Sequence, residues 1–137
     1  MKLQDAQVVV IEDNARSLKL LQALLIDHIA VKSCYAQASG SMFFSWLDSP
    51  IAWTPNLVLL DIQLPREDGY QILQRIRRRP ELDSTRVIAV TANIMQPDLI
   101  ALRAAGFDGL LGKPIRVTAF EEQLGRILNG ESIWDVR

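Results

Sequence analysis

The sequence predicts an α/β domain in which five parallel strands alternate with five helices. Short apolar runs alternate five times with segments of helical spacing, and such alternation implies parallel strands joined by right-handed crossovers. The predicted strands are apolar nearly throughout, as expected for a sheet covered by helices on both faces. With 137 residues, 49% of them hydrophobic, the chain suits one domain with one sizeable core.

The first half of the chain begins with a predicted strand at Val8–Glu12, where an apolar run meets two acidic residues. Asn14 is a candidate N-cap for the following helix, whose apolar face is formed by Leu18, Leu21, Leu25 and Ile29. A second strand is predicted at Ala30–Cys34, followed by a less regular helix over Gln37–Leu47. The Pro- and Trp-containing stretch Ser49–Asn56 indicates a longer loop before the third strand, Leu57–Asp61.

In the second half, a helix is predicted over Arg66–Arg79, with Tyr70, Leu73 and Ile76 inward, and Pro80 stops it. The fourth strand is Arg86–Thr91. The next helix, Ile94–Ala105, has Pro97 in its opening turn and Gly106 as its stop. The fifth strand is Phe107–Gly112. The last helix, Val117–Leu128, has Phe120, Leu124 and Ile127 inward and ends at Asn129-Gly130.

These elements predict one domain over residues 1–130 and a short tail over 131–137. Trp134 in that tail docks either on the body of the protein or on a partner, and the sequence leaves both open. Cys34, the single cysteine, excludes an intramolecular disulfide and is expected in the core. Because residues 1–7 are polar and no apolar run reaches about 18 residues, we expect no signal peptide, no membrane span and a cytoplasmic protein.

The charged side chains restrict the classes of partner. Fifteen basic and 16 acidic residues give a net charge of −1, which argues against a domain built to bind nucleic acid. His28, near the end of the first helix, suits the helix dipole and is not expected to be a catalytic residue. Four arginines are expected on a solvated helix face: Arg75, Arg77, Arg78 and Arg79.

Polar side chains stand at the carboxyl ends of the predicted strands: Glu12, Asp13, Asp61, Thr91 and Lys113. In an open parallel sheet, ligands bind at this edge, where the strand order reverses. If the order is 2-1-3-4-5, strands 1 and 3 are neighbours and the three carboxylates converge. Such a cluster needs a cation, and oxygen ligands suit Mg²⁺. With a lysine and a hydroxyl beside it, the cluster has the parts needed to hold a phosphoryl group.

The chain resembles the receiver domains of response regulators in two-component signalling, along nearly its full length. The matching stretches are Val-Val-Ile-Glu-Asp-Asn at 9–14, Leu-Leu-Asp-Ile-Gln-Leu-Pro at 59–65, Asp-Gly-Tyr at 68–70, Ala-Val-Thr-Ala-Asn at 89–93 and Ala-Gly-Phe-Asp-Gly-Leu-Leu-Gly-Lys-Pro-Ile at 105–115. The resemblance implies a flavodoxin-like (βα)5 three-layer sandwich with strand order 2-1-3-4-5. It also implies a phospho-accepting signalling switch rather than a metabolic enzyme.

The resemblance implies that Asp61 accepts the phosphoryl group from a sensor histidine kinase or a histidine phosphotransfer protein. Mg²⁺, or Mn²⁺, would be held directly by Asp13, Asp61 and the backbone carbonyl of Gln63, and through a water molecule by Glu12. Lys113 would pair with a phosphoryl oxygen. Thr91 would hydrogen-bond the phosphoryl group after transfer.

Several further positions follow from the same resemblance. Ala92 would leave room for the phosphoryl group, Gln63 and Asn93 would tune its lifetime, and the Lys113–Pro114 peptide bond would be cis. Leu110 departs from the family, which usually has Tyr or Phe three residues before the lysine. Leucine lacks a ring and a hydroxyl. This departure therefore affects how a change at Thr91 would be passed to the surface of the fourth and fifth helices.

A receiver without an effector domain would act by binding an unidentified downstream protein or by relaying the phosphoryl group. A dimer through the fourth helix, fifth strand and fifth helix is a further candidate interaction. Two other interpretations remain open. One is a receiver excised from a larger regulator or hybrid kinase. The other is a pseudo-receiver, an interaction module that works without phosphate, and Leu110 is the residue that leaves this possibility open. A phosphohydrolase with an aspartyl nucleophile fits less well, because Gln63 stands where its second aspartate belongs.

Overall fold

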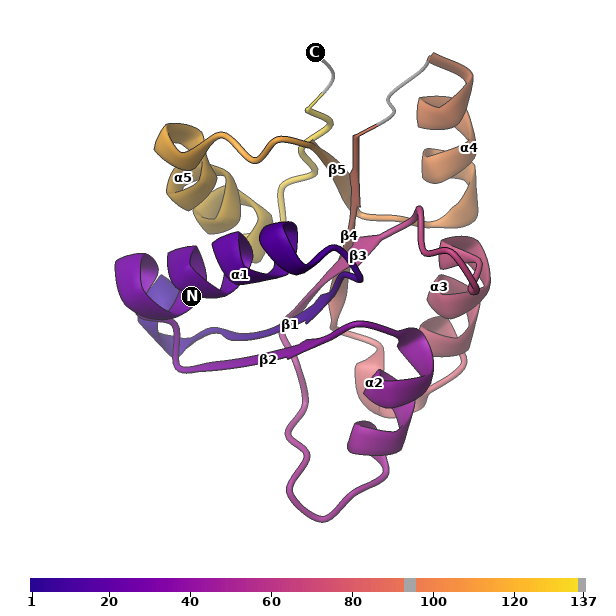
Figure 1. Cartoon of the computed structure of the whole chain (residues 1–137), viewed down its shortest axis with the longest axis horizontal. Coiled ribbons are helices and arrows are strands. Elements are labelled where there is room, and N and C mark those ends of the chain that lie inside the picture. The colour runs from indigo at the N-terminus through magenta and orange to yellow at the C-terminus, as the bar shows by residue number, and fades with distance from the viewer. Residues whose placement is uncertain (93–95, 136–137) are drawn as a thin grey trace.

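The protein is a three-layer α/β sandwich (Figure 1), as the sequence predicted. The computed structural model describes residues 1–92 and 96–135. Five parallel strands lie in the order β2-β1-β3-β4-β5. The strands are β1 Gln7–Ile11, β2 Ser33–Gln37, β3 Leu57–Asp61, β4 Arg86–Thr91 and β5 Gly109–Gly112. The helices are α1 Ala15–Ala23, α2 Gly40–Leu47, α3 Gly69–Arg77, α4 Gln96–Ala105 and α5 Val117–Leu128. Short 3-10 turns occupy Leu3–Asp5 and Pro80–Leu82.

Two hydrophobic clusters, one on each face of the sheet, hold the layers together. Alternate residues of a strand point to opposite faces, so Val9 and Val58 pack under α2, α3 and α4, whereas Val8 and Leu57 pack under α1 and α5. In Figure 1, α1 and α5 lie on one side of the sheet and α2, α3 and α4 on the other. Burial on both faces explains why the strands are apolar at almost every position.

The predicted bounds of the second strand are wrong. The first helix reaches Ile29, as its apolar face predicted, because α1 continues as a π-helical segment, Leu24–Ile29. Ala30 then adopts the left-handed conformation, with φ of 60°, and the N–H of Val31 donates to the carbonyl of Leu25. The apolar stretch around Ala30 therefore closes a helix, and the strand begins only at Ser33. Gln37 consequently belongs to β2, and α2 begins at Gly40.

The other elements differ from prediction mainly at their ends. The predicted bounds of β3, β4 and α5 are confirmed. Helix α3 begins at Gly69, where Asp68 caps it, rather than at Arg66. Helix α4 begins at Gln96, and the predicted start at Ile94 lies outside the described residues. Gly106, with φ of 104°, ends α4 as expected.

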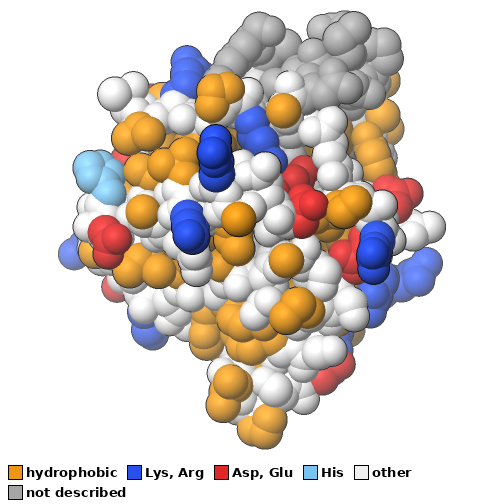
Figure 2. Space-filling model, in the orientation of Figure 1, with side chains coloured by type: hydrophobic (Ala, Val, Ile, Leu, Met, Phe, Trp, Pro, Cys, Tyr) orange, Lys and Arg blue, Asp and Glu red, His pale blue; other side chains and the backbone are white. Residues whose placement is uncertain are grey.

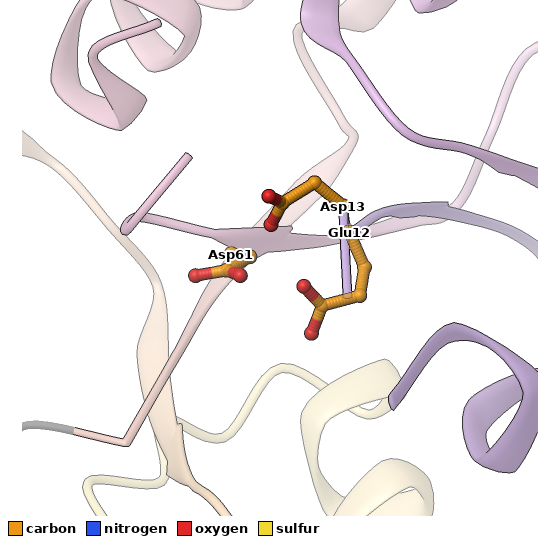
Figure 3. A group of neighbouring side chains, drawn as sticks. All are labelled: Glu12, Asp13 and Asp61. Atoms are coloured by element: carbon orange, nitrogen blue, oxygen red, sulfur yellow. The ribbon is translucent and has the colours of Figure 1, made fainter. Parts of the chain in front are cut away.

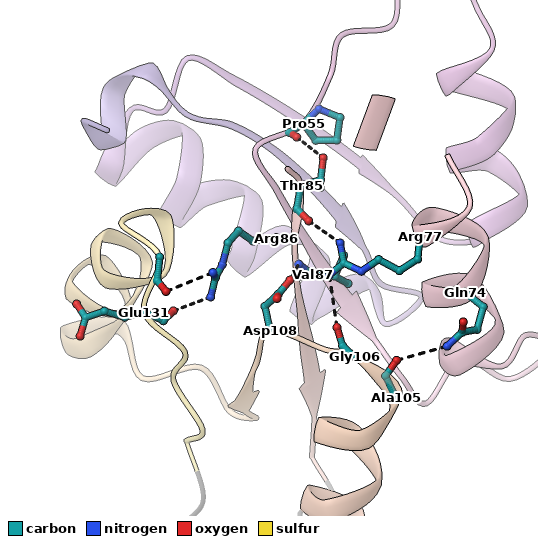
Figure 4. Close-up of polar contacts among 11 residues, drawn as sticks. Pro55, Gln74, Arg77, Thr85, Arg86, Val87, Ala105, Gly106, Asp108 and Glu131 are labelled. Atoms are coloured by element: carbon teal, nitrogen blue, oxygen red, sulfur yellow. Dashed lines mark hydrogen bonds and ion pairs between the residues drawn. The ribbon is translucent and has the colours of Figure 1, made fainter. Parts of the chain in front are cut away.

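The arginines of α3 are more than a solvated helix face. Arg77 donates to the carbonyls of Thr85 and Gly106 and pairs with Asp108 at 2.7 Å (Figure 4), so it joins α3 to the chain on either side of β4. The guanidinium of Arg75 lies 3.9 Å from the ring centre of Phe44. Arg79 pairs with an aspartate and a glutamate, Asp48 and Glu81.

The surface drawn in Figure 2 mixes side chains of both charges with hydrophobic ones. This distribution matches the near-balance of acidic and basic residues in the sequence. His28 is exposed, and its Nε2 lies 3.9 Å from the carboxylate of Glu121. Within residues 1–92 and 96–135, no helix is both long enough and apolar enough to cross a membrane.

Candidate functional site

Three carboxylates gather at the carboxyl edge of the sheet (Figure 3). Asp61 ends β3, and Glu12 and Asp13 follow β1, which lies beside β3 with Ile11 opposite Leu60. One oxygen from each carboxylate lies within 4.8 Å of the others. Glu12 and Asp61 are only 1% and 4% exposed, whereas Asp13 is exposed. A buried pair next to an open carboxylate forms a pocket that solvent enters from the side of Asp13.

Lys113 is the counter-charge of this pocket. Its Nζ lies 3.1 Å from Oδ2 of Asp61 and also contacts Oε1 of Glu12. Its backbone N–H donates to the carbonyl of Thr91, which is 1% exposed at the end of β4. The Lys113–Pro114 peptide bond is cis. The residues that the sequence singled out on four different strands therefore lie around one point.

Backbone groups hold the carboxylates in place. The N–H of Gln63 donates to Oδ1 of Asp61 at 2.8 Å, and the N–H of Asn14 donates to Oε2 of Glu12 at 3.2 Å. Asn14 also accepts from the N–H of Ser17, so the same residue caps α1 and orients Glu12. A residue that starts a helix thereby fixes the geometry of the pocket.

The ionisation states of the pocket follow from burial and from these contacts. Burial, together with a hydrogen bond to Asp61, raises the pKa of Glu12 from 4.5 to about 7. For Asp61, burial acts in the opposite direction to the net result: its bonds with Glu12, Gln63 and Lys113 hold its pKa below the usual 3.8. Burial disfavours charge on Lys113, but the two carboxylates raise its pKa above 10.5. Asp61 is therefore an ionised carboxylate beside a charged lysine.

This donor set fits a divalent cation with oxygen ligands. Lys113 pairs with only two of the three carboxylates, Glu12 and Asp61, so full ionisation leaves uncompensated negative charge that a proton on Glu12 relieves. A hard cation such as Mg²⁺ relieves it better, because it is coordinated by several oxygens at once. Asp13 and Asp61 would hold such an ion, whereas Glu12 is partly engaged by Lys113.

The loop after β3 is held by a contact that the sequence did not reveal. The carboxylate of Glu67 accepts from the N–H groups of Gly40 and Ser41, at 2.8 and 3.0 Å, and so caps α2 from the neighbouring loop. A Cβ on Gly40 would lie 2.8 Å from the side chain of Ile72, so glycine at this position lets the start of α2 lie close to α3. A cavity of about 290 Å³ opens between this contact and Asp13. No local pattern predicts Glu67, because its partners are 26 and 27 residues away.

The predicted tuning and switch positions have different surroundings. Gln63 and Ala92 are exposed beside the pocket, and Asn93 lies outside the described residues. Leu110 is fully buried in the cluster under α4, and its N–H donates to the carbonyl of Ile133 in the tail. The position that usually carries an aromatic ring is therefore occupied by a core leucine.

Comparison with known proteins identifies one family, both by a family model and by a similar relative. The family model described as "Response regulator receiver domain" matches residues 8–124. The polar-differentiation response regulator DivK of Brucella ovis is 32% identical over 117 residues, which cover 85% of this chain and 91% of DivK.

Two solved structures share the fold. The chemotaxis response regulator CheY4 of Vibrio cholerae aligns with a TM-score of 0.78 and 17% identity, over 90% of this chain and 98% of CheY4. The receiver domain of the sensor histidine kinase PA1611 of Pseudomonas aeruginosa, solved with a magnesium ion in its active-site cleft, aligns with a TM-score of 0.76 and 24% identity. That alignment covers 91% of this chain and 98% of the PA1611 domain.

Proposed function

The chain belongs to the response regulator receiver domain family, and from that premise we propose that Asp61 is the residue on which it accepts a phosphoryl group. A receiver domain is a signalling switch rather than a metabolic enzyme. The observation that carries the proposal is the state of Asp61: a buried carboxylate, ionised at neutral pH, with Lys113 at 3.1 Å and two further carboxylates beside it.

In the proposed reaction, a carboxylate oxygen of Asp61 attacks the phosphorus of a phosphohistidine. The new P–O bond forms as the P–N bond breaks, and the histidine leaves with the bonding pair. Lys113 pairs with a phosphoryl oxygen, and the hydroxyl of Thr91 donates to another. The Nζ of Lys113 lies 3.1 Å from Asp61, so it can stabilise the transferred charge without a large rearrangement, whereas Thr91 is proposed to turn toward the phosphoryl group after transfer.

We assign the metal ligands of this reaction to Asp13, Asp61 and the backbone carbonyl of Gln63, with Glu12 acting through water. Mg²⁺, or Mn²⁺, supplies positive charge that lets the incoming phosphoryl group approach three carboxylates. The magnesium ion in the cleft of the PA1611 domain supports this assignment. Ala92, Gln63 and Asn93 are proposed to set the lifetime of the phosphoryl group.

The donor is a histidine kinase, as membership of the family implies, or a phosphotransfer protein that carries the same phosphohistidine. We place the reaction in the cytoplasm and its output in an unidentified protein that binds the phosphorylated chain. The folded body that acts in both steps is proposed to be residues 1–130. The pair α4 and α5, together with β5, is the surface proposed for dimer formation.

The test is intact-mass measurement after incubation with acetyl phosphate and Mg²⁺. The wild-type chain is expected to gain one acid-labile phosphoryl group, and Asp61→Asn to gain none. Asp68→Asn is the matched control, because Asp68 lies in the same loop but only caps α3. An unmodified wild-type chain would favour a pseudo-receiver and contradict the proposal. Rapid turnover of phosphate monoesters would instead favour a phosphohydrolase.

A further inference from the structure

The segment after α5 returns to the sheet and pairs with β5. The N–H of Leu110 donates to the carbonyl of Ile133 at 2.8 Å, and the N–H of Asp135 donates to the carbonyl of Leu110 at 2.9 Å. These two bonds form a parallel bridge between Leu110 and Trp134. Because β5 is the last strand of the five, the segment takes the position that a sixth strand would occupy.

Two arginines hold the side chains of this segment. The guanidinium of Arg103, on α4, lies 4.7 Å from the ring centre of Trp134, and the ring packs against the hydrophobic cluster under α4. Arg116, just before α5, pairs with Asp135 at 2.8 Å, and the side chain of Asp135 is only 8% exposed. The edge of β5 therefore accepts an aromatic residue followed by an acidic one, each with its own cation.

The edge of β5 is shaped for close approach of a backbone. A Cβ on Gly109 would lie 2.6 Å from the carbonyl oxygen of Ile133, so any larger residue there would push the paired segment away. Glycine in a strand often marks a position where another backbone comes near. Gly109 thus keeps this edge open for pairing at a position where a side chain would block it.

The connection from α5 makes the segment an intramolecular ligand. Gly130, with φ of 96°, reverses the chain, and Arg86 donates to the carbonyls of Gly130 and Glu131 at 3.3 and 2.8 Å (Figure 4). Arg126 also bonds the carboxylate of Glu131 at 3.2 Å. In a second copy, the same segment is already held to its own body by these contacts and would have to break them to reach this edge. A second copy is therefore the weaker candidate for the occupant of the β5 edge.

We propose that the outer edge of β5, with Arg103 and Arg116, is a docking site for an extended aromatic–acidic segment of a partner protein. The chain's own residues 133–135 fill this site and compete with the partner. Strand addition at a sheet edge takes its affinity from backbone hydrogen bonds and its specificity from side-chain pockets, and both are present here. A tethered competitor acts at a local concentration on the order of millimolar, so the partner binds well only when the tail is weakened or released.

The test uses the full chain and a fluorescently labelled peptide with the sequence of residues 130–135, followed by fluorescence anisotropy. Trp134→Ala removes the ring that the edge holds in cis, and we expect this variant to bind the peptide at least about ten-fold more tightly than the wild-type chain does. Ser132→Ala is the control, because Ser132 is exposed in the same segment; it is expected to bind as weakly as wild type. Docking at this edge does not involve Asp61, so phosphorylation has no part in the test.

The peptide itself supplies the second half of the test. Replacing its tryptophan or its aspartate by alanine is expected to weaken binding to the Trp134→Ala chain at least about five-fold. Equal binding of all three peptides, or equal binding by the wild-type and variant chains, would overturn the proposal. If circular dichroism shows Trp134→Ala to be unfolded, Asp135→Ala replaces it, since that change breaks the Arg116 pair and keeps the ring of Trp134. A dimer in sedimentation that this peptide dissociates would make the tail of a second copy the occupant and overturn the assignment to a partner; a dimer that the peptide leaves intact does not use this edge and would count against a second copy as the occupant.

Discussion

The carboxyl edge of the sheet and the outer edge of β5 are built by different forces. At the carboxyl edge, Glu12 and Asp61 are buried carboxylates and Lys113 is a partly buried cation, each costly to hold there unless the others are present. At the edge of β5, two backbone hydrogen bonds, one ring and one ion pair hold the tail. Removing one charge from the first region should therefore change its chemistry, whereas removing one contact from the second should change only its occupancy.

Lys113→Met is expected to give the largest effect. It removes the cation that faces Asp61, and phosphorylation by acetyl phosphate should slow by about 100-fold or more, as with the loss of a group that stabilises transition-state charge. The affinity for Mg²⁺ should not fall, because the carboxylates lose the cation that competes with the metal. Initial rates of adduct formation by intact mass, and calorimetric titration with Mg²⁺, measure the two effects.

Arg116→Met is the control for that comparison, because it removes a cation from the second region instead. It should remove the ion pair of Asp135 with residue 116 and leave the phosphorylation rate within about two-fold of wild type. Equal loss of rate in both variants would mean that the two regions are not independent.

The same difference decides what the sequence could predict. Charges at strand ends are rare enough to be informative, and the three carboxylates and Lys113 that the sequence singled out do lie close together. The predicted bounds of β3 and β4 are also confirmed. The tail contact is formed by backbone groups of Leu110 and Ile133, which any residue possesses, and so Trp134 left two interpretations open. Of these, docking on the body is the one found among the described residues.

The strand-boundary error at Ala30 has a related cause. A run of apolar residues fits both a strand and the buried end of a helix, and only the left-handed turn at Ala30 separates them. Glu67 was missed for the opposite reason: its carboxylate is conspicuous, but its partners on α2 are distant in the sequence. Local patterns therefore recover elements and charges, while contacts between distant backbone groups need the fold.

The second prediction concerns pH in a metal-free protein. Because the pKa of Glu12 is about 7 in the folded state against 4.5 ordinarily, the folded chain holds a proton between these values that the unfolded chain has lost. Stability should therefore fall as pH rises from 5 through about 7. The lowered pKa of Asp61 affects stability only below about pH 3.8, and the raised pKa of Lys113 only above about pH 10.5. Neither therefore acts in this window. In the presence of a metal chelator, the melting temperature should drop by roughly 2–8 °C between pH 5 and pH 7.5.

Two changes should abolish that pH dependence. Glu12→Gln has no proton to lose, so its melting temperature should stay nearly constant between pH 5 and 7.5. Saturating Mg²⁺ should restore the stability of the wild-type chain at pH 7.5, because it binds the folded state alone. A wild-type profile as flat as that of Glu12→Gln would rule out a raised pKa at this position.

A third change tests the packing between the two regions. Leu110→Phe inserts a ring into the filled cluster that Trp134 also covers, and it should lower the free energy of unfolding by about 1–3 kcal/mol. In the Trp134→Ala background the ring gains space, so the loss should be smaller by at least about 0.5 kcal/mol. Urea unfolding of the four proteins of this double-mutant cycle gives the coupling. Strictly additive effects would show that Trp134 does not limit the size of residue 110.

The smallest effect is expected from Glu67, which combines both kinds of interaction: a charged side chain that binds backbone N–H groups. Glu67→Ala leaves the N–H groups of Gly40 and Ser41 without their acceptor, and loss of a helix cap costs about 1 kcal/mol in unfolding free energy. Glu81→Ala, which removes only an exposed pairing with Arg79, should change stability by less than about 0.5 kcal/mol. Because the loop that Glu67 anchors carries Gln63, phosphorylation should also slow by a few-fold in Glu67→Ala alone. Loss of stability with an unchanged rate would assign Glu67 to the cap of α2 and leave the loop geometry to Leu64, which is buried beside it.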